Sequence, residues 1–153
     1  MKAIFFIFFI FIYSFQARAD EPNAWAGVGF ESWIGKLPTQ IVDGKALKLI
    51  ETDGVKKITQ KIVPAYEMDA INKYYVESLV SKIDNFIIIN KCMPHNCPSE
   101  LAMIVIDMNS PRIWVGLFLR DDTHSSTRWY SNGDDYSVLP NTIKQSFLER
   151  HGD

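Results

Sequence analysis

The residues best suited to chemistry lie in one short segment, INKCMPHNCPSEL, which spans residues 89–101. It holds the only two cysteines of the chain, Cys92 and Cys97, and places His95 between them. Two thiolates and an imidazole are zinc ligands, but a structural zinc site needs a fourth ligand, and this spacing is shorter than usual. A thiolate and an imidazole can also pair as a nucleophile and its base. If the cysteines are oxidised instead, they close a small ring that carries His95.

The N-terminus indicates which of these states applies. A positive charge at Lys2 precedes a short apolar run and the small-residue pattern Ala-Arg-Ala. This order is typical of a secretory signal peptide, here residues 1–19 with cleavage near Ala19, and the run is shorter than the roughly 20 residues that cross a bilayer. We expect a bacterial periplasmic protein, and disulfides form in that compartment. The sequence therefore favours a disulfide between Cys92 and Cys97 over a metal site or a thiol enzyme, and we expect no cofactor.

The mature chain, residues 20–153, has the length of one domain. It carries 14 basic and 18 acidic side chains, a net charge of −4. Nucleic-acid-binding domains present a basic face, so this charge argues against nucleic acid as a partner, whereas it suits a cationic protein. No second apolar segment approaches the length of a membrane span, so we expect no membrane-embedded part. The sequence leaves the oligomeric state open, a homodimer included.

Two acid pairs are the other candidates for chemistry, Asp121 with Asp122 and Asp134 with Asp135. Glycosidases place two carboxyl groups on opposite sides of the bond that they cleave, and neighbouring residues in a turn do not have this geometry. We therefore expect both pairs to be solvated turn residues.

The elements that position the cysteine segment change type along the chain. A helix is predicted from Thr52 or Asp53 to Pro64, with a cap at one end and a stop at the other. A second helical pattern covers residues 66–85, and the residues on its apolar face are Ile71, Tyr74, Tyr75, Leu79 and Ile83. Short β-branched and aromatic runs then predict antiparallel strands at 86–90, 101–108, 112–119 and 127–132. A closing helix ends at Arg150, with Ile143, Phe147 and Leu148 inward.

This order of elements predicts an α+β fold, an antiparallel sheet of four to five strands with helices packed on one face. The cysteine segment then joins two neighbouring strands at one end of the sheet. A disulfide in so small a ring stabilises the fold by about 2 kcal/mol, so its main effect is on the local shape. Pro94 and Pro98 stiffen the same loop because each fixes φ. His95 stands at the tip, where its imidazole can both donate and accept a hydrogen bond.

The pattern Cys92, Pro94, His95 and Cys97, followed by an apolar strand and the segment VGLF, resembles the inhibitors of vertebrate lysozyme, the Ivy family, over residues 86–148. The resemblance implies a periplasmic protein that blocks the active-site cleft of a C-type lysozyme. The implied target-binding loop consists of Cys92, Met93, Pro94, His95, Asn96 and Cys97. In the family, the histidine of this loop enters the cleft and bonds the catalytic carboxyl groups.

Two loop residues depart from the family pattern. Met93 stands where the family has lysine, and Asn96 where it has aspartate, so one positive and one negative charge are absent. An alternative function uses the same loop on another enzyme: an immunity protein that neutralises a peptidoglycan-degrading bacterial toxin.

Overall fold

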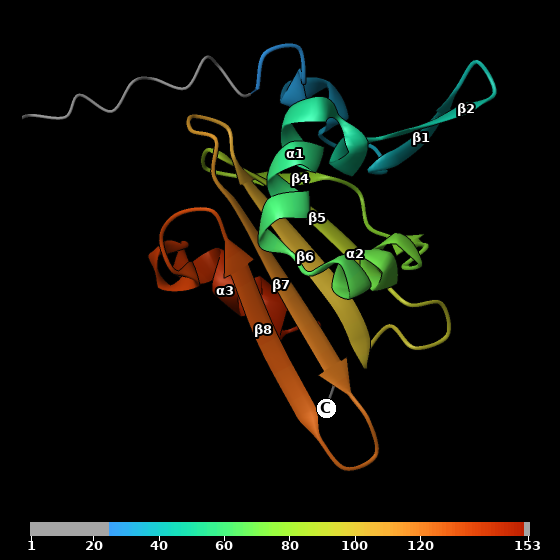
Figure 1. Cartoon of the computed structure of the whole chain (residues 1–153), viewed down its shortest axis with the longest axis vertical. Helices are drawn as coiled ribbons and strands as arrows, with labels where there is room; N and C mark the ends of the chain where they lie inside the picture. The colour runs from blue at the N-terminus through green and yellow to red at the C-terminus, as the bar shows by residue number, and fades with distance from the viewer. Residues whose placement is uncertain (1–24, 152–153) are drawn as a thin grey trace, which may run out of the picture.

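The computed structural model describes residues 25–151, and the predicted signal peptide lies outside these residues (Figure 1). A six-stranded antiparallel sheet has the order β3-β5-β6-β7-β8, with β4 also paired to β5. Its strands are β3 (Val76–Glu77), β4 (Ser81–Ile83), β5 (Phe86–Cys92), β6 (Glu100–Asp107), β7 (Ile113–Arg120) and β8 (Ser125–Ser131). The four predicted strands are confirmed as β5 to β8.

The remaining elements are short helices and one separate hairpin. The hairpin pairs β1 (Thr39–Val42) with β2 (Lys45–Lys48) and projects from the body of the molecule (Figure 1). The α-helices are α1 (Asp53–Ile62), α2 (Ala65–Asn72) and α3 (Asn141–Leu148), and the 3-10 helices are η1 (Phe30–Trp33), η2 (Leu49–Glu51) and η3 (Tyr136–Val138). The α+β class is confirmed. Across the described part of the chain, no helix is long and apolar enough to cross a bilayer.

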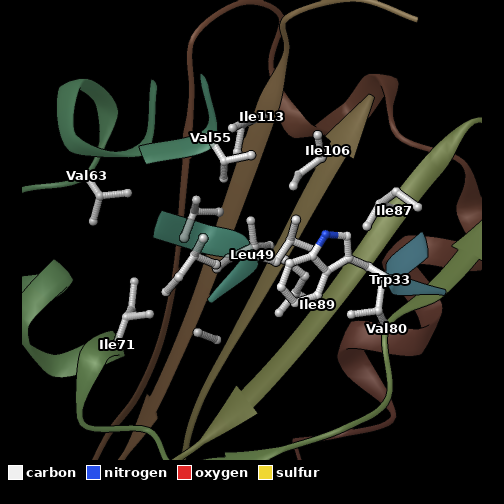
Figure 2. Packing of buried hydrophobic residues seen from close by; sticks show 14 of the residues in the cluster. Trp33, Leu49, Val55, Val63, Ile71, Val80, Ile87, Ile89, Ile106 and Ile113 are labelled. Carbon is white, nitrogen blue, oxygen red and sulfur yellow. The ribbon is translucent and has the colours of Figure 1, made fainter. Parts of the chain in front are cut away.

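The sheet buries apolar side chains on both of its faces. Along β5, Ile87 and Ile89 belong to one core and Ile88 to the other, since neighbouring strand residues point in opposite directions. The first core packs against η1, η2, α1 and α2 (Figure 2). The second packs against α3 through Ile143 and Phe147. The prediction that the helices pack on one face is therefore wrong; the central strands are apolar at nearly every position, which requires cover on both sides.

The second predicted helix is too long. Helix α2 ends at Asn72, and the chain then forms β3 and β4, which pair with β5. Tyr75 and Leu79, predicted to face a core, are 74% and 57% exposed. Without these two strands the backbone groups along one edge of β5 would lack partners, and that requirement outweighs a weak helical pattern.

The closing helix is confirmed as α3, but its predicted apolar face is only partly correct. Ile143 and Phe147 are buried, whereas Leu148 is exposed. The first predicted helix is confirmed as α1, which begins after Thr52 and ends before Pro64.

Candidate binding loop

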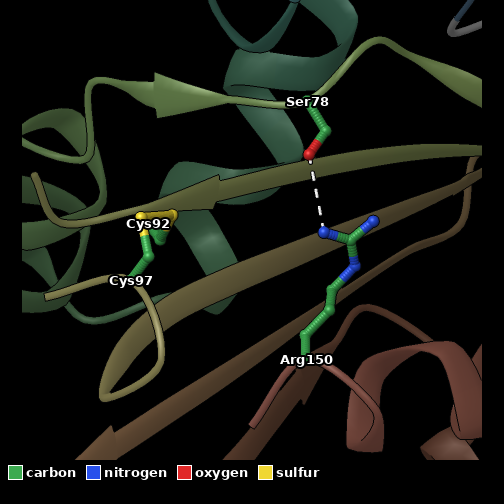
Figure 3. Close-up of a disulfide and its surroundings, with 4 residues drawn as sticks. All are labelled: Ser78, Cys92, Cys97 and Arg150. Atoms are coloured by element: carbon green, nitrogen blue, oxygen red, sulfur yellow. Dashed lines mark hydrogen bonds between the residues drawn. A yellow bond between two sulfur atoms is a disulfide. The ribbon is translucent and has the colours of Figure 1, made fainter. Parts of the chain in front are cut away.

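The predicted loop lies at one end of the sheet, between β5 and β6. Cys92 is the last residue of β5, where it pairs in register with Leu101 of β6. A disulfide joins Cys92 to Cys97, with their Cα atoms 4.8 Å apart (Figure 3). The predicted disulfide is thus confirmed. It leaves neither sulfur as a thiolate, so these cysteines offer neither zinc ligands nor a nucleophile in this state. Within residues 25–151, no group of three His, Cys, Asp or Glu side chains is placed to hold a metal ion.

A β-turn forms the tip of the loop. The backbone N–H of Asn96 donates to the carbonyl oxygen of Met93 at 3.0 Å, which places Pro94 and His95 at the two central positions. Proline first and a positive φ second are the signature of a type II turn. His95 has φ 65°, a left-handed conformation that costs a residue with a Cβ about 1 to 2 kcal/mol. The surrounding ring and its hydrogen bonds stabilise this conformation.

His95 is exposed, and its imidazole is available to a partner. No hydrogen bond or ion pair ties this side chain to any other part of residues 25–151. Both ring nitrogens can therefore bond an external group without first breaking a contact within the protein.

The two residues that depart from the family pattern are directed toward the body of the protein. The Asn96 side chain donates from Nδ2 to Oε1 of Glu100 at 2.8 Å, and the backbone carbonyl of Asn96 accepts from the backbone N–H of Glu100 at the same distance. Met93 packs against the first core, while its backbone N–H donates to the carbonyl of Glu100 at 2.9 Å. The loop is consequently held by contacts with the start of β6. Sequence analysis missed Glu100, because a spacing of four residues predicts a side-chain contact in a helix and not in a loop.

A second hairpin connection, between β7 and β8, lies beside the loop. The two are joined where the backbone N–H of Arg120 donates to the carbonyl of Ser99 at 2.7 Å. In this turn Oδ1 of Asp121 accepts from the backbone N–H groups of Thr123 and His124, both at 2.8 Å, and from the Thr123 hydroxyl at 2.9 Å. The bond from the Thr123 backbone, followed by those from His124 and the hydroxyl, lowers the pKa of Asp121. Nδ1 of His124 lies 2.6 Å from the Thr123 hydroxyl.

All four acids of the two pairs are exposed, as predicted, and three of them have structural partners. Asp135 accepts from the backbone N–H of Ser137 and so caps η3, while Asp134 forms an ion pair with Arg112. The carboxylate of Asp121 likewise organises its own turn. These three acids thus have contacts within turns and between neighbouring segments.

A buried ion pair supports the strand next to the loop. Nζ of Lys91 lies 3.3 Å from Oε1 of Glu77, and both side chains are almost inaccessible. Thr39 donates to the same carboxylate from its backbone N–H at 3.1 Å and from its hydroxyl at 2.9 Å. Burial lowers the pKa of Lys91, and the neighbouring Glu77 opposes that shift. Sequence analysis missed this pair because Glu77 was placed in the predicted helix over residues 66–85, whereas it lies in β3, which pairs with β5.

A hollow of 240 Å³ opens at the foot of the loop. Its lining includes the disulfide as well as Ser78 and Arg150, which are 72 residues apart in the sequence but lie near each other (Figure 3). Nη1 of Arg150 donates to the Ser78 hydroxyl at 3.4 Å, a long and therefore weak hydrogen bond.

Comparison with known proteins identifies one family. The sequence model described as Inhibitor of vertebrate lysozyme (Ivy) matches residues 55–150, more than half of the chain. The match includes α1 and α2 as well as the loop, so it begins well before the predicted limit at residue 86. No curated protein and no solved structure matches the chain.

Proposed function

Because this chain belongs to the inhibitor of vertebrate lysozyme (Ivy) family, we propose that it inhibits a lysozyme by placing the loop from Cys92 to Cys97 in the active-site cleft. The observation that carries this proposal is the exposed imidazole of His95, free of contacts at the tip of a covalently closed loop. The protein acts by binding and needs no catalytic group of its own.

The mechanism follows from the chemistry of the two partners. A lysozyme cleft contains one carboxyl group that stays protonated and one that is ionised. An imidazole placed between them forms charge-assisted hydrogen bonds, which are roughly twice as strong as neutral ones. These bonds occupy the groups that act on the glycan, so inhibitor and substrate exclude each other.

The ordered loop favours binding for an entropic reason. Immobilising a flexible segment during association costs free energy, and a segment that is already rigid avoids much of this cost. Here the disulfide, the turn at Pro94 and the bond between Asn96 and Glu100 order the loop before it meets the enzyme. We also propose that the chain is exported through a signal peptide at residues 1–19 and acts in the periplasm, where this disulfide can form.

A competition assay tests the proposed function. The purified mature chain is expected to inhibit a vertebrate C-type lysozyme, and a chito-oligosaccharide that fills the same cleft should raise the apparent inhibition constant in proportion to its concentration. Inhibition that is indifferent to the oligosaccharide would contradict a block of the cleft. The same assay should include bacterial peptidoglycan hydrolases. A chain that inhibits one of these and no lysozyme would be an immunity protein instead.

A further inference from the structure

The loop alone is too small to form a stable complex. A standard interface buries about 800 Å² on each partner and involves roughly 20 residues or more on each side. The loop has six residues, of which Met93 is partly committed to the core. A second surface next to the loop must therefore contact the same enzyme.

We propose that this second surface is the sheet edge formed by Tyr75 and Val76, together with the hollow behind them, and that it receives an apolar side chain from the rim of the target's cleft. This inference rests on the proposed function, because it takes the lysozyme held by the loop as the partner.

The strand register places Val76 directly beside the disulfide. Val76 pairs with Cys92 and Glu77 pairs with Lys91. The ion pair shows that Glu77 and Lys91 share one face of the sheet, so Val76 and Cys92 share the other. An enzyme that takes up the loop therefore has its cleft rim next to Val76.

The exposure of this edge is not explained by the fold. Tyr75 is 74% exposed and Val76 is 44% exposed, although both are large apolar residues at an open sheet edge. Aromatic residues are enriched in the cores of protein interfaces, which makes the exposed ring of Tyr75 a candidate contact, while Val76 lines the hollow. In the neighbouring turn, by contrast, the polar groups of Asp121, Thr123 and His124 bond one another.

The chemistry of the hollow indicates what it accepts. Cys92, Cys97, Pro98 and Leu101 supply an apolar lining continuous with Val76. The polar residues of its lining are Ser78, Asn90, Lys91, Glu149 and Arg150. An apolar side chain fits the part of the lining beside Val76 and the disulfide, and the weak bond between Arg150 and Ser78 can yield as it enters. Filling a desolvated hollow in this way is typical of the few residues that dominate binding energy.

Dissociation constants with a vertebrate C-type lysozyme test the inference. Tyr75→Ala and Val76→Asp are each expected to weaken binding at least tenfold, which is the effect of losing a central contact. The matched control is Val138→Asp, which changes a residue that is 55% exposed on η3, an element that contacts β8 at the other end of the strand order from β3. It should stay within twofold of wild type. Melting curves identify any variant that is unfolded at the assay temperature.

A measurement on the wild type avoids mutation altogether. Hydrogen exchange in the complex should slow at the backbone N–H groups of residues 75–79 as well as in the loop. If Tyr75→Ala binds within twofold of wild type and these groups exchange at unchanged rates, the proposal of a second surface is wrong. In that case a loss of binding in His95→Ala would still support the proposed function. If wild type binds no lysozyme, both proposals are overturned together.

Discussion

Two hairpin connections at the same end of the sheet each present a histidine, and they are made rigid in different ways. The loop between β5 and β6 is closed by a disulfide, by backbone hydrogen bonds and by the side-chain bond from Asn96 to Glu100, and the His95 side chain takes no part in any of these. The turn between β7 and β8 has one backbone hydrogen bond, from the N–H of Asp121 to the carbonyl of His124, and is otherwise held by side chains: the Asp121 carboxylate accepts from two backbone N–H groups, and His124 contacts the Thr123 hydroxyl.

The comparison shows that a loop can be rigid and still leave its side chain free to bind a partner. A turn held by its own polar side chains has used the groups with which it could bind a partner, and releasing them costs hydrogen bonds. Covalent closure orders the first loop without using the imidazole. The first loop is therefore the better binding element, although both histidines are exposed.

The largest expected effect comes from truncating each histidine in turn. His95→Ala leaves two carboxyl groups of the target unmatched inside a closed cleft, which costs about 2 kcal/mol or more, roughly thirtyfold in the inhibition constant. His124→Ala should change inhibition less than threefold, since that imidazole is engaged within its own turn. Inhibition constants against the same lysozyme measure both. A His95→Ala chain that inhibits within threefold of wild type would show that the loop does not act through its imidazole.

The second effect concerns covalent closure. Cys92→Ser combined with Cys97→Ser removes a stabilisation of about 2 kcal/mol, which a fold with two apolar cores should survive. The freed loop must then be ordered during binding, so we expect about tenfold weaker inhibition with only a modest fall in melting temperature. Calorimetry and inhibition assays on the same preparation compare the two losses. If the variant is unfolded at 25 °C, the disulfide serves mainly to stabilise the fold and not to order the loop.

The third effect isolates the contact between the loop and β6. Glu100→Ala removes the acceptor of the Asn96 side chain, and losing one such bond costs about 1 kcal/mol, or about fivefold in the inhibition constant. Glu100→Gln is the matched control, because its amide oxygen can still accept from Asn96. Restored inhibition in the glutamine variant would identify orientation of the loop as the role of Glu100. Equal inhibition by wild type and both variants would contradict that role.

The local features of the loop were predictable from the sequence, and its long-range support was not. Two cysteines five positions apart behind a predicted export signal predict a disulfide, and Pro94 predicts a turn. The left-handed conformation of His95 has no such signal, because a proline at the first central position suits type I and type II turns alike. The pair between Lys91 and Glu77 depends on the register of β3 against β5, which a helical pattern over residues 66–85 concealed.

The strands were likewise predictable from local sequence, but their long-range packing was not. The runs that form β5, β6 and β7 were recognised because β-branched residues and turns mark them locally. Their continuous apolar character is typical of strands that are buried on both faces, whereas the prediction placed helices on one face only. Which helix covers which face depends on contacts between distant segments, and α3 reaches the second face only at the end of the chain.

The smallest expected effect is the pH dependence of stability that comes from Asp121 in the turn between β7 and β8. Hydrogen bonds hold the pKa of Asp121 below its ordinary value in the folded state. Its contribution to stability is therefore fully present above the unfolded-state pKa of about 3.9 and is lost as the pH falls through the lower folded-state value. Asp121→Asn removes the charge that produces this dependence, so the melting temperature of this variant should lie slightly below that of wild type at pH 7 and approach it near pH 3.

Asp122→Asn, in the same turn, is the control for the loss of one negative charge. Because the turn uses its own polar groups, inhibition at pH 7 should change less than threefold in both variants. A gap in melting temperature that is equal at the two pH values would mean that the Asp121 carboxylate does not hold the turn, and the contrast with the disulfide-closed loop would lose its physical basis.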